Sequence, residues 1–255
     1  LDDLLDVVND FGIKITRSAL DRALRRNDLA NLRDYISSLN PEEKAQYKEF
    51  KSYEPGFLHI DIKYLPKIDG KEREYLFVAI DRATRLVYVE VMPNKSSENA
   101  NIFLENVIKY FPFEIKKVLT DNGKEFTDRF NNAHKKPTGE HIFDKTCAEN
   151  EIEHRLTAPY TPKTNGMVER MNGKITENVL DRIKFDSKEE LKQSIMNYVY
   201  NYNHHIKHSG INRKTPIECL EKWFNEKPEL FKVDIETFKS AENRLYSNDY
   251  RRGLD

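Results

Sequence analysis

Three short segments with the pattern of β-strands follow one another between residues 56 and 92. They span Gly56 to Leu65, Glu74 to Asp81 and Leu86 to Met92, and each is rich in branched and aromatic residues. The polar connections between them are short, and short connections favour antiparallel neighbours. The spacing therefore predicts an antiparallel meander.

Beyond the meander, helical and strand patterns alternate. Apolar residues at helical spacing over 96–111 predict a helix capped by Ser96 or Ser97, and the run "IKKVLT" predicts a strand. A helix at 143–150, the strand "IEHRL", the helix "MVERMNGKITENVLDRIK" and a tyrosine-rich helix at 188–204 follow. This order predicts an α/β domain whose mixed five-stranded sheet is flanked by helices.

The composition is that of a folded chain. Of the 255 residues, 38% are hydrophobic and 33% are charged, which is typical of a soluble globular protein, and the 11% of aromatic residues argue against disorder. No apolar run approaches the roughly 20 residues of a membrane helix, and the start of the chain lacks the basic flank of a signal peptide, so we expect a cytosolic protein. Leu1 in place of Met indicates a fragment or missing earlier residues. Cys147 and Cys219 lie far apart and predict packed thiols.

The first part of the chain has the pattern of two helices separated by the breaker "NDFG". Thr16 or Ser18 can cap the second helix. Four arginines lie on its polar side, namely Arg17, Arg22, Arg25 and Arg26. A basic helix of this kind suits the major groove of DNA, although a solvated face is the simpler alternative.

These patterns divide the chain into four parts. A helix-turn-helix is predicted at 1–39 and a polar linker at 40–55. The α/β core is predicted at 56–205, and a helical or extended tail at 206–255. The net charge of -1 means that any contact with nucleic acid must rely on local basic patches.

Three acidic residues occupy positions where a functional crevice is expected. Asp61 interrupts the apolar strand "GFLHIDIKYLP", Asp121 ends the strand in "VLTDNG", and Glu169 opens the helix after "TPKTNG". Strand ends and helix starts line one edge of an open sheet, so the three carboxylates can converge. Clustered carboxylates repel one another unless cations neutralise them, and oxygen ligands select Mg²⁺ or Mn²⁺.

Each of these signals has a simpler alternative. Asp121 before "NG" is also a good turn former, and we favour a turn or an arginine partner for the similar Asp81. His59 shares the strand parity of Asp61 and can face the site or a packed neighbour. Glu125 is interpreted as a solvated acid rather than a metal ligand. Loosely spaced residues that include His154 offer a zinc site, which we do not favour.

Five stretches in order carry a resemblance to a known family, and they run from about Gly56 to Leu220. They are "HIDIKYLP", "YLFVAIDRATRLVYVEVMP", "VLTDNGKEFT", "IEHRLTAPYTPKTNGMVERMNGKI" and "YNYNHHIKHSGINRKTPIECL". Together they resemble the DDE transposases of bacterial insertion sequences, whose catalytic core is similar to retroviral integrase. The resemblance implies an RNase H-like core, with Asp61, Asp121 and Glu169 as the metal-binding triad.

The resemblance also implies the reaction and its partners. Two Mg²⁺ or Mn²⁺ ions would support cleavage of DNA at the element ends and attack of the freed 3′-hydroxyl on target DNA. Double-stranded DNA and a homo-oligomer, at least a dimer, are the expected partners, and no membrane is expected. The expected location is the bacterial cytoplasm, in association with DNA. The alternatives are an inactive transposase-derived DNA-binding protein and a nuclease acting on RNA in hybrids.

The sequence departs from the family pattern near the third acid. Between Asp121 and Glu169, 47 residues intervene where about 35 are usual, which predicts an enlarged surface loop. Lysines that retroviral integrases place four and seven residues after the glutamate are replaced by Gly173 and Thr176. The remaining candidates for DNA contact in this region are Tyr160, Arg170, Lys174 and Lys163, the last standing where glutamine is usual.

Overall fold

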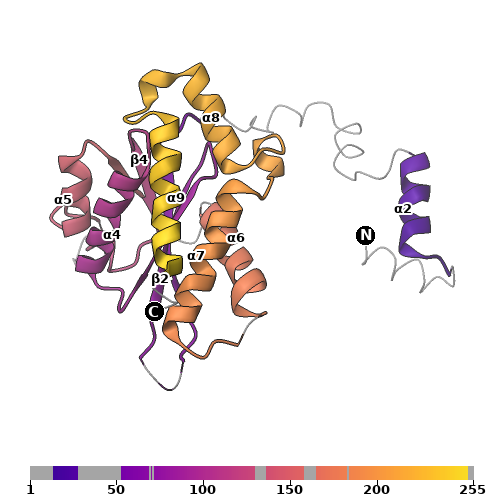
Figure 1. The fold of residues 1–255 in the computed structure, drawn as a ribbon, viewed down its shortest axis with the longest axis horizontal. Helices are drawn as coiled ribbons and strands as arrows, with labels where there is room; N and C mark the ends of the chain where they lie inside the picture. Colours follow the sequence, from indigo (N-terminus) through magenta and orange to yellow (C-terminus); the bar gives the residue numbers. More distant parts are fainter. Residues whose placement is uncertain are drawn as a thin grey trace. The chain divides into compact units, whose positions relative to one another are not determined.

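A computed structural model describes residues 14–27, residues 53–157 except 69, 71 and 130–135, and residues 165–251 except 183; side chains are described as far as 246. The chain divides into two compact units, at 1–52 and 53–255, which are described separately. In the second unit, strands form one sheet between two groups of helices (Figure 1).

The sheet has five strands in the order β3-β2-β1-β4-β5. Their bounds are Phe57–Tyr64 for β1, Tyr75–Asp81 for β2, Val87–Met92 for β3, Lys117–Thr120 for β4 and Glu153–Leu156 for β5. The first three strands pair antiparallel, whereas β4 runs parallel to both β1 and β5. This is the meander and the mixed sheet that the sequence predicts.

Strand β1 is buried on both faces because it lies at the centre of the sheet. Leu58 and Ile60 belong to a first core. The sheet shares this core with helices α4 (Ser97–Tyr110), α5 (Ile142–Glu149) and α8 (Pro216–Glu226). The alternate residues His59 and Asp61 point to the opposite face. In the register with β2, His59 pairs with Ile80 and Asp61 pairs with Val78. That face forms a second core with the helices that follow β5. The alternation therefore directs Asp61 toward these helices.

Helices α4 and α5 cover the first core. Helix α4 spans Ser97–Tyr110, and the Ser96 side chain caps it by accepting from the Asn99 backbone. Helix α5 spans Ile142–Glu149 and contributes the fully buried Phe143. The predicted helices at 96–111 and 143–150 therefore form within a residue or two of their expected ends.

Helices α6 and α7 cover the second core. Helix α6 spans Gly166–Ile175 and continues into a π-helical turn at Thr176–Leu180. The sequence pattern predicts uninterrupted helix here, and such single π turns are frequent at functional sites. Helix α7 spans Lys188–His204 and buries its apolar stripe, including Val199 and Tyr202.

Two further helices extend the core beyond α7. Helix α8 spans Pro216–Glu226 and begins with a capping box, while α9 spans Ile235–Arg251. Short 3₁₀ turns at Ser209–Ile211 and Pro228–Leu230 connect them. The Glu242 carboxylate of α9 accepts from the Tyr110 hydroxyl of α4 and from the Asn203 amide of α7. Helix α9 therefore joins the two helical groups (Figure 1).

The described part of the first unit is helix α2, Arg17–Arg26. The Thr16 hydroxyl caps it by accepting from the Ala19 backbone, as the sequence allows. The helix predicted before "NDFG" and most of the linker lie outside the described residues. Among the helices that are described, none is long and apolar enough to cross a membrane.

Candidate active site

Asp61 is fixed in the middle of β1 and faces α6. The Asn172 side-chain amide of α6 donates to Asp61 Oδ2 at 2.8 Å. Burial raises the pKa of Asp61 to about 6, and the nearby charges of Asp121 and Glu169 add to the shift. The three predicted acids therefore lie close enough for their charges to interact.

Asp121 directly follows the last residue of β4. Its Oδ1 accepts from the Gly123 backbone at 2.8 Å, which closes the "DNG" turn. Desolvation by neighbouring protein atoms raises the pKa of the Asp121 carboxyl, and the negative charge of Glu125 raises it further. Parallel pairing of β4 with β1 brings this strand end to the same side of the sheet as Asp61.

Glu169 lies in the first turn of α6 and is exposed. The start of this helix is tied to β1, because the Asn165 side-chain oxygen lies 3.2 Å from His59 Nδ1. The backbone of Glu169 also donates to the Asn165 carbonyl. Burial lowers the pKa of His59 to about 4, so its ring is neutral near pH 7. His59 thus makes a supporting hydrogen bond between two elements that carry acids.

The donor set of the three acids fits a hard divalent cation. Asp61, Asp121 and Glu169 supply only carboxylate oxygens, which are the ligands that Mg²⁺ and Mn²⁺ prefer. Within the described ranges, no three histidine, cysteine or acidic side chains already surround one point closely enough to hold an ion. The three carboxylates are therefore near enough to influence one another's charge, but they do not converge on a single point.

The interpretation of Glu125 as a solvated acid is wrong. Glu125 is 5% exposed, and its Oε1 accepts from Lys95 Nζ at 3.1 Å. Its carboxyl lies against the turn, since a Cβ added at Gly123 would approach it to 2.7 Å. A buried carboxylate is retained where a cation pairs with it, and Lys95, in the connection between β3 and α4, supplies that cation.

Asp81 is held by the β2–β3 turn, as predicted. Its carboxylate accepts from the backbones of Ala83 and Thr84 and from the Thr84 hydroxyl, at 2.7 to 3.0 Å. A further bond comes from the Gly56 backbone at 3.0 Å. Burial raises the pKa of Asp81, while these four donors favour its ionised form. The residue is fully buried and serves the fold.

The predicted DNA contacts of the core are described only in part. Arg170 is exposed on α6. Lys174 is half-buried, with its ammonium 5.5 Å from the centre of the Tyr202 ring. Tyr160 and Lys163 lie outside the described residues.

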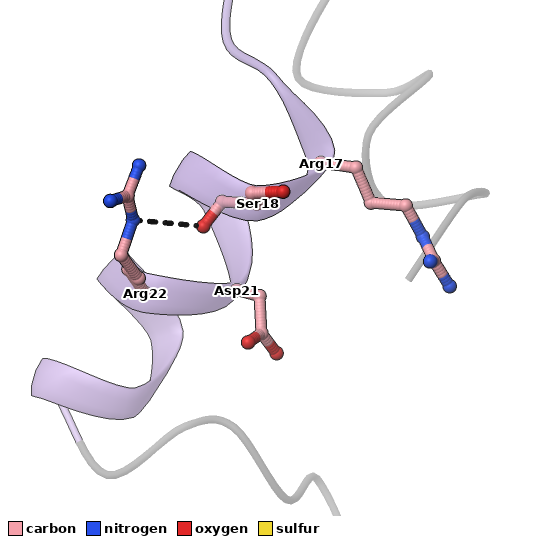
Figure 2. A pocket seen from close by; sticks show the side chains of 4 residues that line it. All are labelled: Arg17, Ser18, Asp21 and Arg22. Atoms are coloured by element: carbon pink, nitrogen blue, oxygen red, sulfur yellow. Dashed lines mark hydrogen bonds between the residues drawn. The ribbon is translucent and has the colours of Figure 1, made fainter.

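Helix α2 engages part of its arginine face in contacts of its own. Arg25 forms an ion pair with Asp21 at 2.8 Å, and Arg22 Nε donates to the Ser18 carbonyl at 3.2 Å. Figure 2 shows Arg17 and Arg22 reaching out from the helix on either side of Ser18 and Asp21. The predicted DNA-contacting arginines Arg17 and Arg26 belong to the same exposed helix.

Sequence reasoning missed the residues that support the acids. Asn172 stands three positions after Glu169 on the same helical stripe, and this spacing is the signal that could have identified it. Lys95 and Asn165 carry no such signal, because their partners are distant in sequence. Cys147 and Cys219 are buried free thiols, as predicted.

Comparison with known families places an integrase core domain on this fold. One family model, described as "Integrase core domain", matches residues 52–162, and a second with the same description matches 150–216. Together they cover the five strands, α6, α7 and the residues that carry the three acids.

Several proteins share this region. The ORF3 product of Spiroplasma virus SpV1-C74, whose name assigns it to the integrases, is 28% identical over 185 residues, which cover 70% of this chain and 51% of that protein. The retrovirus-related Pol polyprotein from transposon TNT 1-94 of Nicotiana tabacum is 29% identical over 113 residues, 44% of this chain and 8% of that protein. The chain thus spans about half, or less, of the length of these relatives.

The fold has solved counterparts. A chain of the simian T-cell lymphotropic virus intasome, solved in complex with PP2A regulatory subunit B56 gamma, superposes with a TM-score of 0.53. The match covers 68% of this chain and 56% of that one, at 18% identity. This likeness concerns the fold, and it agrees with the predicted RNase H-like core. The two matches, which carry the same description and run from residue 52 to residue 216, identify this part of the chain as an integrase core domain.

Proposed function

We propose that the chain is a DDE-type polynucleotidyl transferase that cleaves DNA strands and transfers them in transposition. The observation that carries the proposal is the placement of three acids on neighbouring elements. Asp61 lies in β1 beside the parallel strand β4, which Asp121 follows, and Asp61 is bonded to α6, which carries Glu169 in its first turn. An integrase core supplies the context for these acids. Carboxyl groups with a raised pKa, here those of Asp61 and Asp121, are typical of functional sites.

Asp61, Asp121 and Glu169 would hold Mg²⁺ or Mn²⁺, with two ions expected. Bound metal would supply charge stabilisation and an activated oxygen nucleophile for phosphodiester chemistry. The protein's own part is positioning: β1 fixes Asp61, the "DNG" turn fixes Asp121, and the bond between His59 and Asn165 fixes the start of the helix that carries Glu169. Phosphoryl transfer needs little more than placement and charge.

Contacts with DNA would come from two parts of the chain. The arginines of α2, Arg17, Arg22, Arg25 and Arg26, would bind the major groove as the second helix of a helix-turn-helix. Arg170, Lys174 and Lys163 would contact phosphates near the acids, and Tyr160 would stack on a base. Two element ends must be brought together, so we expect at least a dimer that acts on DNA in the bacterial cytoplasm.

The test is a cleavage and strand-transfer assay on duplexes that carry the element's end sequence. Wild-type protein is compared with Asp121→Asn in Mg²⁺, Mn²⁺ or EDTA. We expect wild type to give products only when metal is present. In the variant the rate of product formation should fall by roughly a thousandfold, a loss of about 4 kcal/mol of transition-state stabilisation. Equal activity of the two proteins would sink the assignment, and tight binding without products in either would favour the DNA-binding alternative.

A further inference from the structure

The end of β4 is held by a partly buried series of hydrogen bonds that the proposed chemistry does not use. Thr120, the last residue of β4, is fully buried. Its hydroxyl donates to the main-chain carbonyl of Asp121 at 2.9 Å. The Nε2 of His154, on the neighbouring strand β5, lies 2.9 Å from the same hydroxyl oxygen. The His154 tautomer sets the direction of this bond, which joins β5 to the end of β4.

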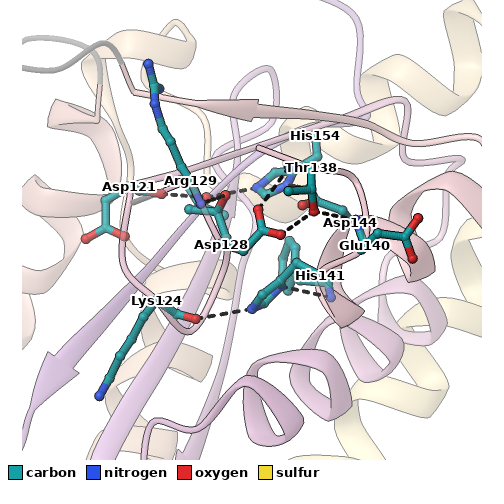
Figure 3. A network of polar contacts seen from close by, with 12 residues as sticks. Asp121, Lys124, Asp128, Arg129, Thr138, Glu140, His141, Asp144 and His154 are labelled. Atoms are coloured by element: carbon teal, nitrogen blue, oxygen red, sulfur yellow. Dashed lines mark hydrogen bonds and ion pairs between the residues drawn. The ribbon is translucent and has the colours of Figure 1, made fainter. Parts of the chain in front are cut away.

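The ring of His154 is itself fixed from the other side. Its Nδ1 lies 2.5 Å from Asp144 Oδ1 of α5, and the two side chains are only 6% and 16% exposed. The ring also packs on Phe143, with centroids 4.9 Å apart. Figure 3 shows the run of contacts from Asp144 through His154 to the strand end that carries Asp121. Helix α5, β5 and β4 are therefore linked through the side chains of Asp144, His154 and Thr120.

The residues after Asp121 are held as well. The Asn122 side-chain amide donates to the Thr157 carbonyl at 2.8 Å, and the Thr157 backbone donates to the Thr120 carbonyl at 3.0 Å. These bonds tie the "DNG" turn to the continuation of β5. Strand β4 has only four residues, so its ladder alone restrains the strand end weakly.

We propose that Asp144, His154 and Thr120 are positioning residues that set the orientation of Asp121. The inference rests on the proposed function, in which Asp121 holds metal. A carbonyl held by the Thr120 hydroxyl fixes the peptide that follows β4, and hence the direction of the Asp121 carboxylate. The arrangement resembles the outer hydrogen bonds that orient metal ligands in proteins, whose loss costs about 10- to 100-fold in affinity or activity.

Thr120→Val tests this series of hydrogen bonds, because valine keeps the shape of the side chain and removes the hydroxyl. We expect kcat for DNA cleavage to fall about 10- to 100-fold with little change in KM for DNA. Independently of activity, we expect the amide of Gly123, which donates to Asp121 Oδ1, to exchange with solvent roughly tenfold faster, measured by NMR. Thr120→Ser restores the hydroxyl and should return both readouts near wild type.

Thr84→Val is the matched control. Thr84 is fully buried at another strand end, and its hydroxyl donates to Asp81. Its loss should lower the melting temperature but leave kcat and Gly123 exchange unchanged. Asp144→Asn provides a second variant that leaves Thr120 in place, and we expect the same direction of change with a smaller size.

The two claims fail separately. If wild type shows no metal-dependent cleavage, the proposed function is wrong. Gly123 exchange in Thr120→Val still decides whether Asp144, His154 and Thr120 position the turn. If Thr120→Val and Asp144→Asn behave like Thr84→Val in Gly123 exchange, with wild type active or not, the positioning role is overturned.

Discussion

Asp81 and Asp121 look alike in sequence and differ in the folded chain. Each ends a buried strand and opens a turn, in "AIDRAT" and in "VLTDNG". The Asp81 carboxylate accepts four hydrogen bonds and is fully buried. The Asp121 carboxylate accepts from the Gly123 backbone and lies near the acids Asp61 and Glu125. A carboxylate surrounded by donors serves the fold, whereas one beside like charges is suited to a cation.

The sharpest way to break this comparison is to neutralise each residue in turn. Asp121→Asn should lower strand cleavage by roughly a thousandfold, about 4 kcal/mol, and leave the free energy of unfolding nearly unchanged. Asp81→Asn should do the reverse and lower the free energy of unfolding by about 3 kcal/mol, because an amide group then faces buried donors. Urea unfolding and cleavage assays measure both quantities. Loss of activity with full stability in Asp81→Asn would remove the distinction.

Gly56 offers a second test of the claim that Asp81 serves the fold. Its backbone donates to Asp81, its φ is +107°, and an added Cβ would lie 2.3 Å from the Glu114 carbonyl oxygen. Gly56→Ala should therefore lower the free energy of unfolding by about 2 to 3 kcal/mol. Gly70→Ala is the control, since its φ is also positive but no atom lies within 4 Å of the new Cβ. Equal losses in the two variants would mean that backbone strain alone matters.

The pH dependence of stability tests the claim that Asp61 lies beside other acids. In the absence of metal, Asp61 has a pKa of about 6 in the folded chain against 3.8 as its ordinary value. The folded state therefore binds this proton more tightly than the unfolded state does. The resulting contribution to the free energy of unfolding is complete below about pH 4 and is lost as the pH rises through about 6. Relative to Asp61→Asn, wild type should gain about 2 kcal/mol on moving from pH 7.5 to about pH 4. Parallel stability curves for the two proteins would contradict the shift.

The smallest expected effect concerns α2. Replacing Arg22, Arg25 and Arg26 by Ala should weaken DNA binding and reduce the slope of log affinity against log salt by about 3, since roughly one counterion is released per phosphate contact. Cleavage chemistry in the core should not need these side chains. Binding measured from low to moderate salt decides the matter, and an unchanged slope would leave them as a solvated face.

Much of the fold follows from local pattern. The five strands and helices α4, α5 and α7 appear where periodicity and caps predict them, because burial on one or both faces leaves a clear repeat in "HIDIKYL" and in 96–111. The triad candidates came from their positions at strand and helix ends together with the family resemblance. The prediction that Asp81 serves a turn is also confirmed.

What could not be predicted depends on partners far apart in sequence. Glu125 is buried because Lys95, 30 positions away, pairs with it. Helix α9 reaches both helical groups through Glu242, and its spacing alone gives no hint of that role. The bond between Asn165 and His59 spans 106 positions. Long-range pairs of this kind leave no periodic signal.

The most direct test of the central claim is to count Mn²⁺ bound to the protein on a duplex carrying the element's end, by electron paramagnetic resonance. Wild type should bind about two ions, and Asp61→Asn, Asp121→Asn and Glu169→Gln should each bind fewer or bind them more weakly. Asp81→Asn, where it remains folded, should match wild type. Mn²⁺ binding that is the same in wild type and in all three triad variants would contradict the claim that these acids form one metal site.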